Sequence, residues 1–114
     1  MNIFRGIVQE GAKRAAALGY PTVNIPLRDT DVSGVYAARV RIEKKEYVAA
    51  VFADQKRKLL EAYLLDFAPR QLYGETVAIE LHKKIRDTKE FDNDEALSEE
   101  IKRDIATVRR YFKK

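Results

Sequence analysis

Two oxygen-bearing side chains stand two positions apart in the most unusual segment of the chain, residues 18–24, whose sequence is LGYPTVN. In an extended backbone, Thr22 and Asn24 point to the same side. A hydroxyl and an amide carbonyl are hard oxygen ligands of the kind that hold Mg²⁺ while phosphate oxygens and water complete its coordination. The segment therefore predicts a magnesium site. The alternative is a turn that leads into a strand, with both side chains bonded to the backbone.

A second candidate is Glu61, an acid that lies among large apolar residues in the segment 59–67, LLEAYLLDF. Burial there would raise the pKa of the carboxyl group, because desolvation disfavours its charged form. Such a carboxylate could act as a general base. The alternative is an exposed glutamate on the rim of a strand, because charged side chains are seldom buried.

A third candidate is the segment 85–91, IRDTKEF, which places two cations and an aromatic residue close together. Arg86 and Lys89 could bind an anionic or carbonyl-rich ligand, and Phe91 could stack on a planar ring. The alternative is a solvated loop in which Phe91 packs against the start of the following helix.

The elements that must position these side chains are predicted to be mostly strands. Apolar and charged residues alternate with period two between residues 33 and 42, which indicates a half-buried strand with Arg39 and Arg41 facing outward. The segments 47–53, 60–67 and 77–85 predict further strands. The strands over residues 33–42 and 47–53 are expected to form a hairpin. Residues 1–9 predict one more, where Gly6 marks either a bulge or a close backbone approach.

The last part of the chain has a different period. Its apolar residues recur every three or four positions, which predicts an amphipathic helix over residues 94–112 that packs one stripe on the sheet. Asp92 and Glu95 are spaced as in a capping box. Many short strands followed by one helix favour an antiparallel barrel. The apolar stripe consists of Leu97, Ile101, Ile105, Val108 and Phe112.

Composition excludes several classes of site and fold. The 114 residues suit one domain, residues 1–114. The chain has no cysteine, which excludes disulfides and thiolate metal sites, and its one histidine excludes a multi-histidine metal centre. That histidine, His82, is expected on the outward face of its strand with no role in chemistry. A net charge of +4 is compatible with phosphate ligands but does not indicate nucleic acid.

The sequence also predicts where the protein resides. No segment approaches the roughly 20 consecutive apolar residues that span a bilayer, and the first residues of the sequence lack the charged region followed by an apolar region that is typical of a secretion signal. We therefore expect a cytoplasmic protein without a membrane partner, and we expect it to be a monomer.

The order of these segments along the chain resembles the riboflavin kinase family, whose members phosphorylate riboflavin to FMN. The resemblance implies a mainly β fold, a six-stranded antiparallel Greek-key barrel with a C-terminal α-helix. It also implies that MgATP binds on one side and riboflavin on the other, with phosphorylation at the ribityl 5′-hydroxyl. The matching elements are GIV at 6–8, Gly11 with Arg14, LGYPTVNI at 18–25, GVYA at 34–37, Glu61 with Asp66 and Phe67, LYG at 72–74, Ile85 with Arg86, Lys89 and Phe91, and finally Leu97, Ile101 and Asp104.

The resemblance assigns roles to some of the matching residues. Glu61 would be the base for the 5′-hydroxyl, and Thr22 and Asn24 would contact the magnesium ion that accompanies ATP. The nucleotide contacts fall on Gly11, Arg14, Thr22, Asn24 and Tyr73, and the flavin contacts fall on Arg86, Lys89 and Phe91.

The chain departs from the family pattern in two places. Ala15 and Ala16 stand where the family loop has a Gly-Arg pair, and the link between two strands, residues 53–58, is short. An alternative is therefore a flavin- or nucleotide-binding module on the same barrel with lost or weak kinase activity. A more distant alternative is an oligonucleotide-binding barrel. Nucleic acid is not expected as a partner, because the aromatic residues are placed as core rather than as exposed stacking platforms.

Overall fold

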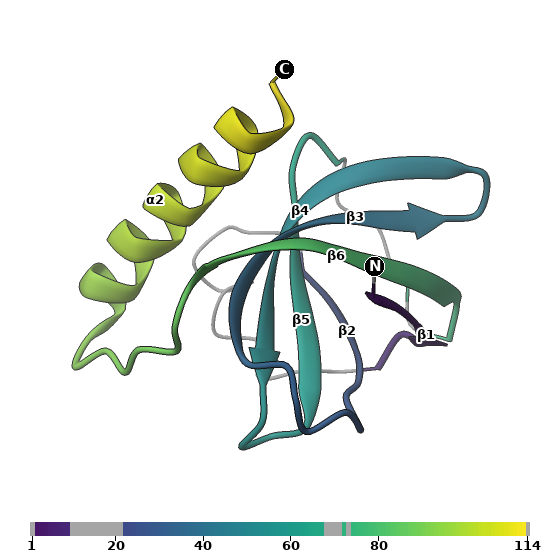
Figure 1. Ribbon diagram of the computed structural model, residues 1–114, viewed down its shortest axis with the longest axis horizontal. Coiled ribbons are helices and arrows are strands. Elements are labelled where there is room, and N and C mark those ends of the chain that lie inside the picture. Colours follow the sequence, from purple (N-terminus) through teal and green to yellow (C-terminus); the bar gives the residue numbers. More distant parts are fainter. Residues whose placement is uncertain (1, 10–21, 68–71, 73, 114) are drawn as a thin grey trace.

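The computed structural model describes residues 2–9, 22–67, 72 and 74–113. Within these residues the chain forms six strands followed by one helix at the C-terminal end (Figure 1). The elements are β1 (Asn2–Ile7), β2 (Thr22–Pro26), β3 (Gly34–Ile42), β4 (Lys45–Asp54), β5 (Leu59–Leu64), β6 (Thr76–Arg86) and α2 (Asp94–Phe112).

The strands form one antiparallel sheet that curls into a nearly closed barrel. Their order is β1-β6-β3-β4-β5-β2, so β1 and β2 are the two edges. The edges meet just after β1, where the amide of Gln9 donates to the carbonyl oxygen of Asn24 at 2.8 Å. This architecture confirms the predicted six-stranded barrel with a C-terminal helix.

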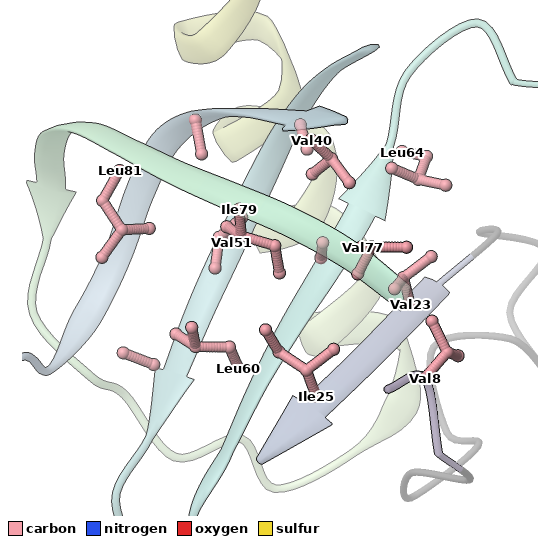
Figure 2. Packing of buried hydrophobic residues seen from close by; sticks show 14 of the residues in the cluster. Val8, Val23, Ile25, Val40, Val51, Leu60, Leu64, Val77, Ile79 and Leu81 are labelled. Carbon is pink, nitrogen blue, oxygen red and sulfur yellow. The ribbon is translucent and has the colours of Figure 1, made fainter. Parts of the chain in front are cut away.

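Every second residue along the strands points inward, and these side chains fill the barrel interior (Figure 2). On β6, Val77, Ile79 and Leu81 point inward, as their period-two spacing predicts. The residues between them face outward. The largest fully buried side chains of this interior cluster are Ile25, Leu27, Leu60, Ile79, Val23, Val40, Val51 and Val77.

At positions 6 and 34 another part of the chain lies close to the backbone, and this close approach requires glycine. A Cβ atom on Gly6 would lie 3.0 Å from the Cβ of Ile25, while the pairing of β1 with β6 runs through Gly6 without a register shift. Of the two predicted reasons for Gly6, the close approach is therefore correct and the bulge is wrong. The irregularities lie instead between β3 and β6. Gly34 has a φ of +92°, and a side chain there would collide with the carbonyl oxygen of Arg86.

Helix α2 packs against the outer face of the barrel, over β3 and β4 (Figure 1). Ala37 and Ala50 lie opposite each other in register and are fully buried beneath it, so their small side chains let the helix approach closely. Ile101 and Val108 of the helix complete this second apolar cluster. The predicted apolar stripe of the helix is therefore confirmed.

His82 lies on the outer face of β6, as predicted. Its Nε2 atom is 2.6 Å from Oε1 of Glu80, and its ring packs edge-on at 5.2 Å from the ring of Phe112 near the end of α2. Arg39, also facing outward, places its guanidinium 4.7 Å from the centre of the same Phe112 ring. Both residues therefore help to seat the C-terminal end of the helix.

The start of α2 differs from the prediction. Asn93, and not Asp92, is the N-cap, and its side-chain oxygen accepts a hydrogen bond from the amide of Ala96 at 2.8 Å. The reason is geometric: the helix begins at Asp94, so the residue directly before it holds the capping position. In the part of the chain that the structure describes, no helix has the length and apolar character needed to cross a membrane.

Candidate functional site

A pocket of about 700 Å³ lies on the outer face of the barrel, beside α2. Its volume is in the range of small-molecule sites, roughly 300–1,000 Å³. The barrel supplies residues of β3, β4 and β5 and the last residue of β6, and the helix supplies Leu97 and Ile101. The mouth is formed by the turn after β4 and the segment after β6. The lining combines apolar side chains with a small group of charged ones, which suits a ligand with one apolar part and one polar part.

Glu61 lies in this pocket and is only 7% exposed. The alternative of an exposed rim glutamate is therefore wrong, because α2 and the mouth segments cover the outer face where an isolated strand would meet water. Burial raises the pKa of the Glu61 carboxyl group. A hydrogen bond from the Tyr63 hydroxyl to Oε1, at 2.9 Å, and the positive charge of Arg57 oppose that rise, while Asp54 adds to it.

The predicted oxygen ligands lie next to Glu61. Asn24 is directly opposite Glu61 in the pairing of β2 with β5, and Thr22 is opposite Tyr63. Residues directly opposite each other in an antiparallel pair face the same side, with Cβ atoms roughly 5 Å apart. The two strands thus bring the hydroxyl and amide of β2 to the same patch as the carboxylate of β5.

Asn24 has an unusual buried acceptor. The side chain is 4% exposed, and its Oδ1 atom has no hydrogen-bond partner among the residues that the structure describes. An unsatisfied buried oxygen costs free energy, so a site of this kind is suited to a cation or to a donor from a ligand. Among the described residues, no cluster of three or more His, Cys, Asp or Glu side chains offers an alternative metal site.

Arg86 lines the pocket, but its guanidinium is committed to the helix. Its Nε and Nη2 atoms donate to the two carboxylate oxygens of Asp104, both at 2.8 Å, and Nη1 donates to the carbonyl of Asp87 at 3.0 Å. Glu100 adds a second acid at 3.4 Å. Burial opposes the charge of Arg86, yet these hydrogen bonds and acids outweigh it and raise its pKa, so the side chain stays cationic.

Lys89 and Phe91 lie nearer the mouth of the pocket. Lys89 places its Nζ atom 3.4 Å from Glu100, and its side chain is more than half exposed. The guanidinium of Arg86 lies 6.0 Å from the centre of the Phe91 ring. An exposed ion pair between Lys56 and Glu90, at 3.3 Å, joins the two segments that form the mouth.

The remaining predicted residues, Gly11, Arg14 and Tyr73, lie outside the residues that the structure describes, as do Ala15 and Ala16. The structure places the predicted base and the three predicted flavin contacts in one pocket. Thr22 and Asn24 lie beside the base on the neighbouring strand and are not among the residues that line the pocket.

Sequence reasoning assigned no role to Tyr63 and Asp104, although a signal existed for each. Tyr63 follows Glu61 by two positions in a strand and so must share its face. Asp104 lies beside the apolar stripe of α2, where a buried acid needs a partner, and it is 4% exposed.

Comparisons with known proteins show which family the chain belongs to. The sequence matches the family described as "Flavokinase: Riboflavin kinase" over residues 2–112. The bifunctional riboflavin kinase/FMN adenylyltransferase of Buchnera aphidicola subsp. Acyrthosiphon pisum is 36% identical over 118 residues, covering 94% of this chain and 37% of that protein. The RNA-binding riboflavin kinase RibR of Bacillus subtilis is 31% identical over 120 residues, covering 98% of this chain and 52% of that protein. The chain thus spans about half or less of the length of these relatives.

Two solved structures share the fold. A crystal structure of a macrolide-efflux protein from Streptococcus pneumoniae gives a TM-score of 0.80 at 31% identity, covering 94% of this chain and 38% of that chain. A crystal structure of riboflavin kinase from Trypanosoma brucei gives a TM-score of 0.70 at 28% identity, covering 98% of this chain and 80% of that chain. The sequence match extends over nearly the whole barrel and helix. This chain belongs to the riboflavin kinase (flavokinase) family.

Proposed function

We propose that this chain transfers the terminal phosphoryl group of ATP to the ribityl 5′-hydroxyl of riboflavin, producing FMN. The observation that carries the proposal is Glu61, a buried carboxylate in the pocket, placed directly opposite Asn24 on the neighbouring strand. A base beside oxygen ligands suited to a cation is what phosphoryl transfer to an alcohol needs. The family membership and the relatives named as riboflavin kinases support the same activity.

Riboflavin would occupy the pocket with its ring system toward the helix and its ribityl chain toward Glu61. Leu97 and Ile101 offer apolar contacts to the ring, and Phe91 offers an aromatic face at the mouth. Lys89, which is partly exposed there, would bind a flavin carbonyl. Arg86 would act mainly as part of the wall, because its hydrogen bonds already go to Asp104 and Asp87.

The chemical step follows from the place of Glu61. Its carboxylate takes the proton of the 5′-hydroxyl while the hydroxyl oxygen forms a bond to the γ-phosphorus of ATP. The bond from that phosphorus to the bridging oxygen breaks, and ADP leaves. Burial raises the pKa of Glu61 toward the working pH, which makes this carboxylate a stronger base than an exposed one.

The residues of β2 fit a magnesium ion. Asn24 Oδ1 is a buried acceptor without a partner among the described residues, and Thr22, two positions before it, lies on the same face of the strand. Thr22 and Asn24 would hold Mg²⁺, which would neutralise negative charge on the ATP phosphates. Gly11, Arg14 and Tyr73 remain the predicted nucleotide contacts.

The test is incubation of the purified chain with riboflavin, ATP and MgCl₂, followed by chromatographic separation of FMN and ADP. We expect FMN and ADP in equal amounts, and no FMN when EDTA replaces MgCl₂. A parallel titration follows riboflavin fluorescence without ATP. Binding of riboflavin with no FMN formed would contradict the kinase proposal and favour the flavin-binding module. Absence of both binding and turnover would contradict the assignment of the pocket as well.

A further inference from the structure

Tyr63 is the direct hydrogen-bond partner of the Glu61 carboxylate. The two residues alternate with inward-facing neighbours on β5, so both face the pocket side of the sheet. The Tyr63 side chain is 8% exposed, and its ring packs in the apolar cluster beneath α2. Its hydroxyl donates to Oε1 of Glu61 at 2.9 Å. The ring is therefore held by packing, and the hydroxyl is held at the carboxylate.

Toward the ionised Glu61 carboxylate, the Tyr63 hydroxyl can act only as a donor. Burial and the neighbouring Glu61 carboxylate both raise its pKa, so the hydroxyl keeps its proton throughout any practical assay range. Because Oε1 already accepts this bond, the second oxygen, Oε2, is the freer and more basic one to receive a proton from a substrate hydroxyl. A carboxylate held at one oxygen also has less freedom to rotate away from its substrate.

Other charged groups face this pair from β4, from the turn after it and from α2. Asp54 of β4 and Arg57 of the following turn pair with each other at 2.7 Å and act on Glu61 with opposite signs. Asp104 of α2 faces Tyr63 and is neutralised by Arg86 of β6. The two residues of β2 that lie opposite this pair, Thr22 and Asn24, are uncharged. The hydrogen bond from Tyr63 is thus the closest interaction that favours the ionised carboxylate.

We propose that Tyr63 is a positioning residue for Glu61, whose hydroxyl fixes Oε1 so that Oε2 receives the proton of the riboflavin 5′-hydroxyl. The inference rests on the proposed function, because it assigns Tyr63 a part in that reaction. It assigns no proton transfer to Tyr63 itself.

The test compares wild-type protein with Tyr63→Phe, which removes the hydroxyl and keeps the ring. We expect kcat to fall about ten-fold, the scale of one hydrogen bond to a charged group, with the KM values for riboflavin and ATP changed much less. Without the bond the ionised form of Glu61 is less stable, so its pKa rises and the acidic limb of the kcat profile moves to higher pH. Tyr47→Phe is the matched control, because Tyr47 packs edge-on against Phe67 outside the pocket lining.

A Tyr63→Phe protein with the wild-type kcat and pH profile would overturn the inference while leaving the kinase assignment intact. If wild type makes no FMN, the proposed function fails, and ¹³C NMR titration of the Glu61 carboxyl group still tests the pair. An upward shift of its midpoint in Tyr63→Phe supports the positioning contact, and an unchanged midpoint overturns it. Should the variant not fold, the Tyr63 Cζ resonance of wild type must follow the Glu61 titration; a resonance that does not respond overturns the inference.

Discussion

The ion pair between Arg86 and Asp104 predicts a large effect on stability from one small substitution. Asp104→Asn keeps the size of the side chain and removes its charge. Asp104 is 4% exposed and accepts two hydrogen bonds from Arg86, so the substitution leaves a largely buried guanidinium without its main charged partner. Breaking a buried pair in this way costs roughly 3–5 kcal/mol.

The structure lowers that figure for two reasons. The Arg86 side chain is 18% exposed, so solvent screens part of its charge, and Glu100 lies 3.4 Å from its Nε atom as a second acid. We therefore expect a loss of about 2–3 kcal/mol in the free energy of unfolding. Urea titration followed by circular dichroism measures this quantity.

Glu99→Gln on the same helix is the matched control, because Glu99 pairs with Lys102 at 3.6 Å on the exposed side. Its expected cost is below about 0.5 kcal/mol. Equal losses for Asp104→Asn and Glu99→Gln would refute the reasoning that the pair with Arg86 holds α2 to the barrel. If Glu100 substitutes for Asp104, Glu100→Gln should cost more in the Asp104→Asn background than in wild type.

Three further predictions address the site and the helix. Glu61→Gln, measured by FMN formation and by riboflavin fluorescence, should lower kcat by roughly 10²–10⁴ with flavin affinity nearly unchanged; wild-type turnover would show that Glu61 is not the base. Thr22→Ala and Asn24→Ala should each weaken MgATP binding in calorimetric titrations and raise the Mg²⁺ requirement, and unaltered affinity in both would remove the metal assignment. Asn93→Ala should lower the free energy of unfolding by about 1 kcal/mol in urea titrations, whereas Asp92→Ala should cost much less; the reverse order would contradict the observed cap.

The sequence was a reliable guide to the elements because their signals are local. Period-two alternation on β3 and β6 and the three-to-four spacing of the helix follow directly from which residues must leave water. The position of the helix cap was harder to predict, since Asp92 and Asn93 are both good capping residues and only the backbone path decides between them. The register shifts between β3 and β6 likewise depend on how the two strands pair, which the sequence of neither strand reveals alone.

The candidate site was predictable in part. Asn24 and Glu61 could be named as chemical groups, but their adjacency depends on β2 pairing with β5 across a separation of nearly forty residues. Burial of Glu61 could not be read from β5 alone, because the cover comes from α2 and the mouth segments. The commitment of Arg86 to Asp104 depends on the same docking of the helix.

Alternate residues of β5 meet two different requirements, because one set packs inside the barrel and the other lines the pocket. Leu60, Ala62 and Leu64 belong to the barrel interior, whereas Glu61 and Tyr63 belong to the pocket outside it. A substitution at an outward position can therefore alter ligand choice or rate without leaving a cavity in the interior. Changes at the inward positions would affect folding first. A barrel that keeps its chemistry on the outside of its wall can thus acquire new substrates while its interior packing stays the same.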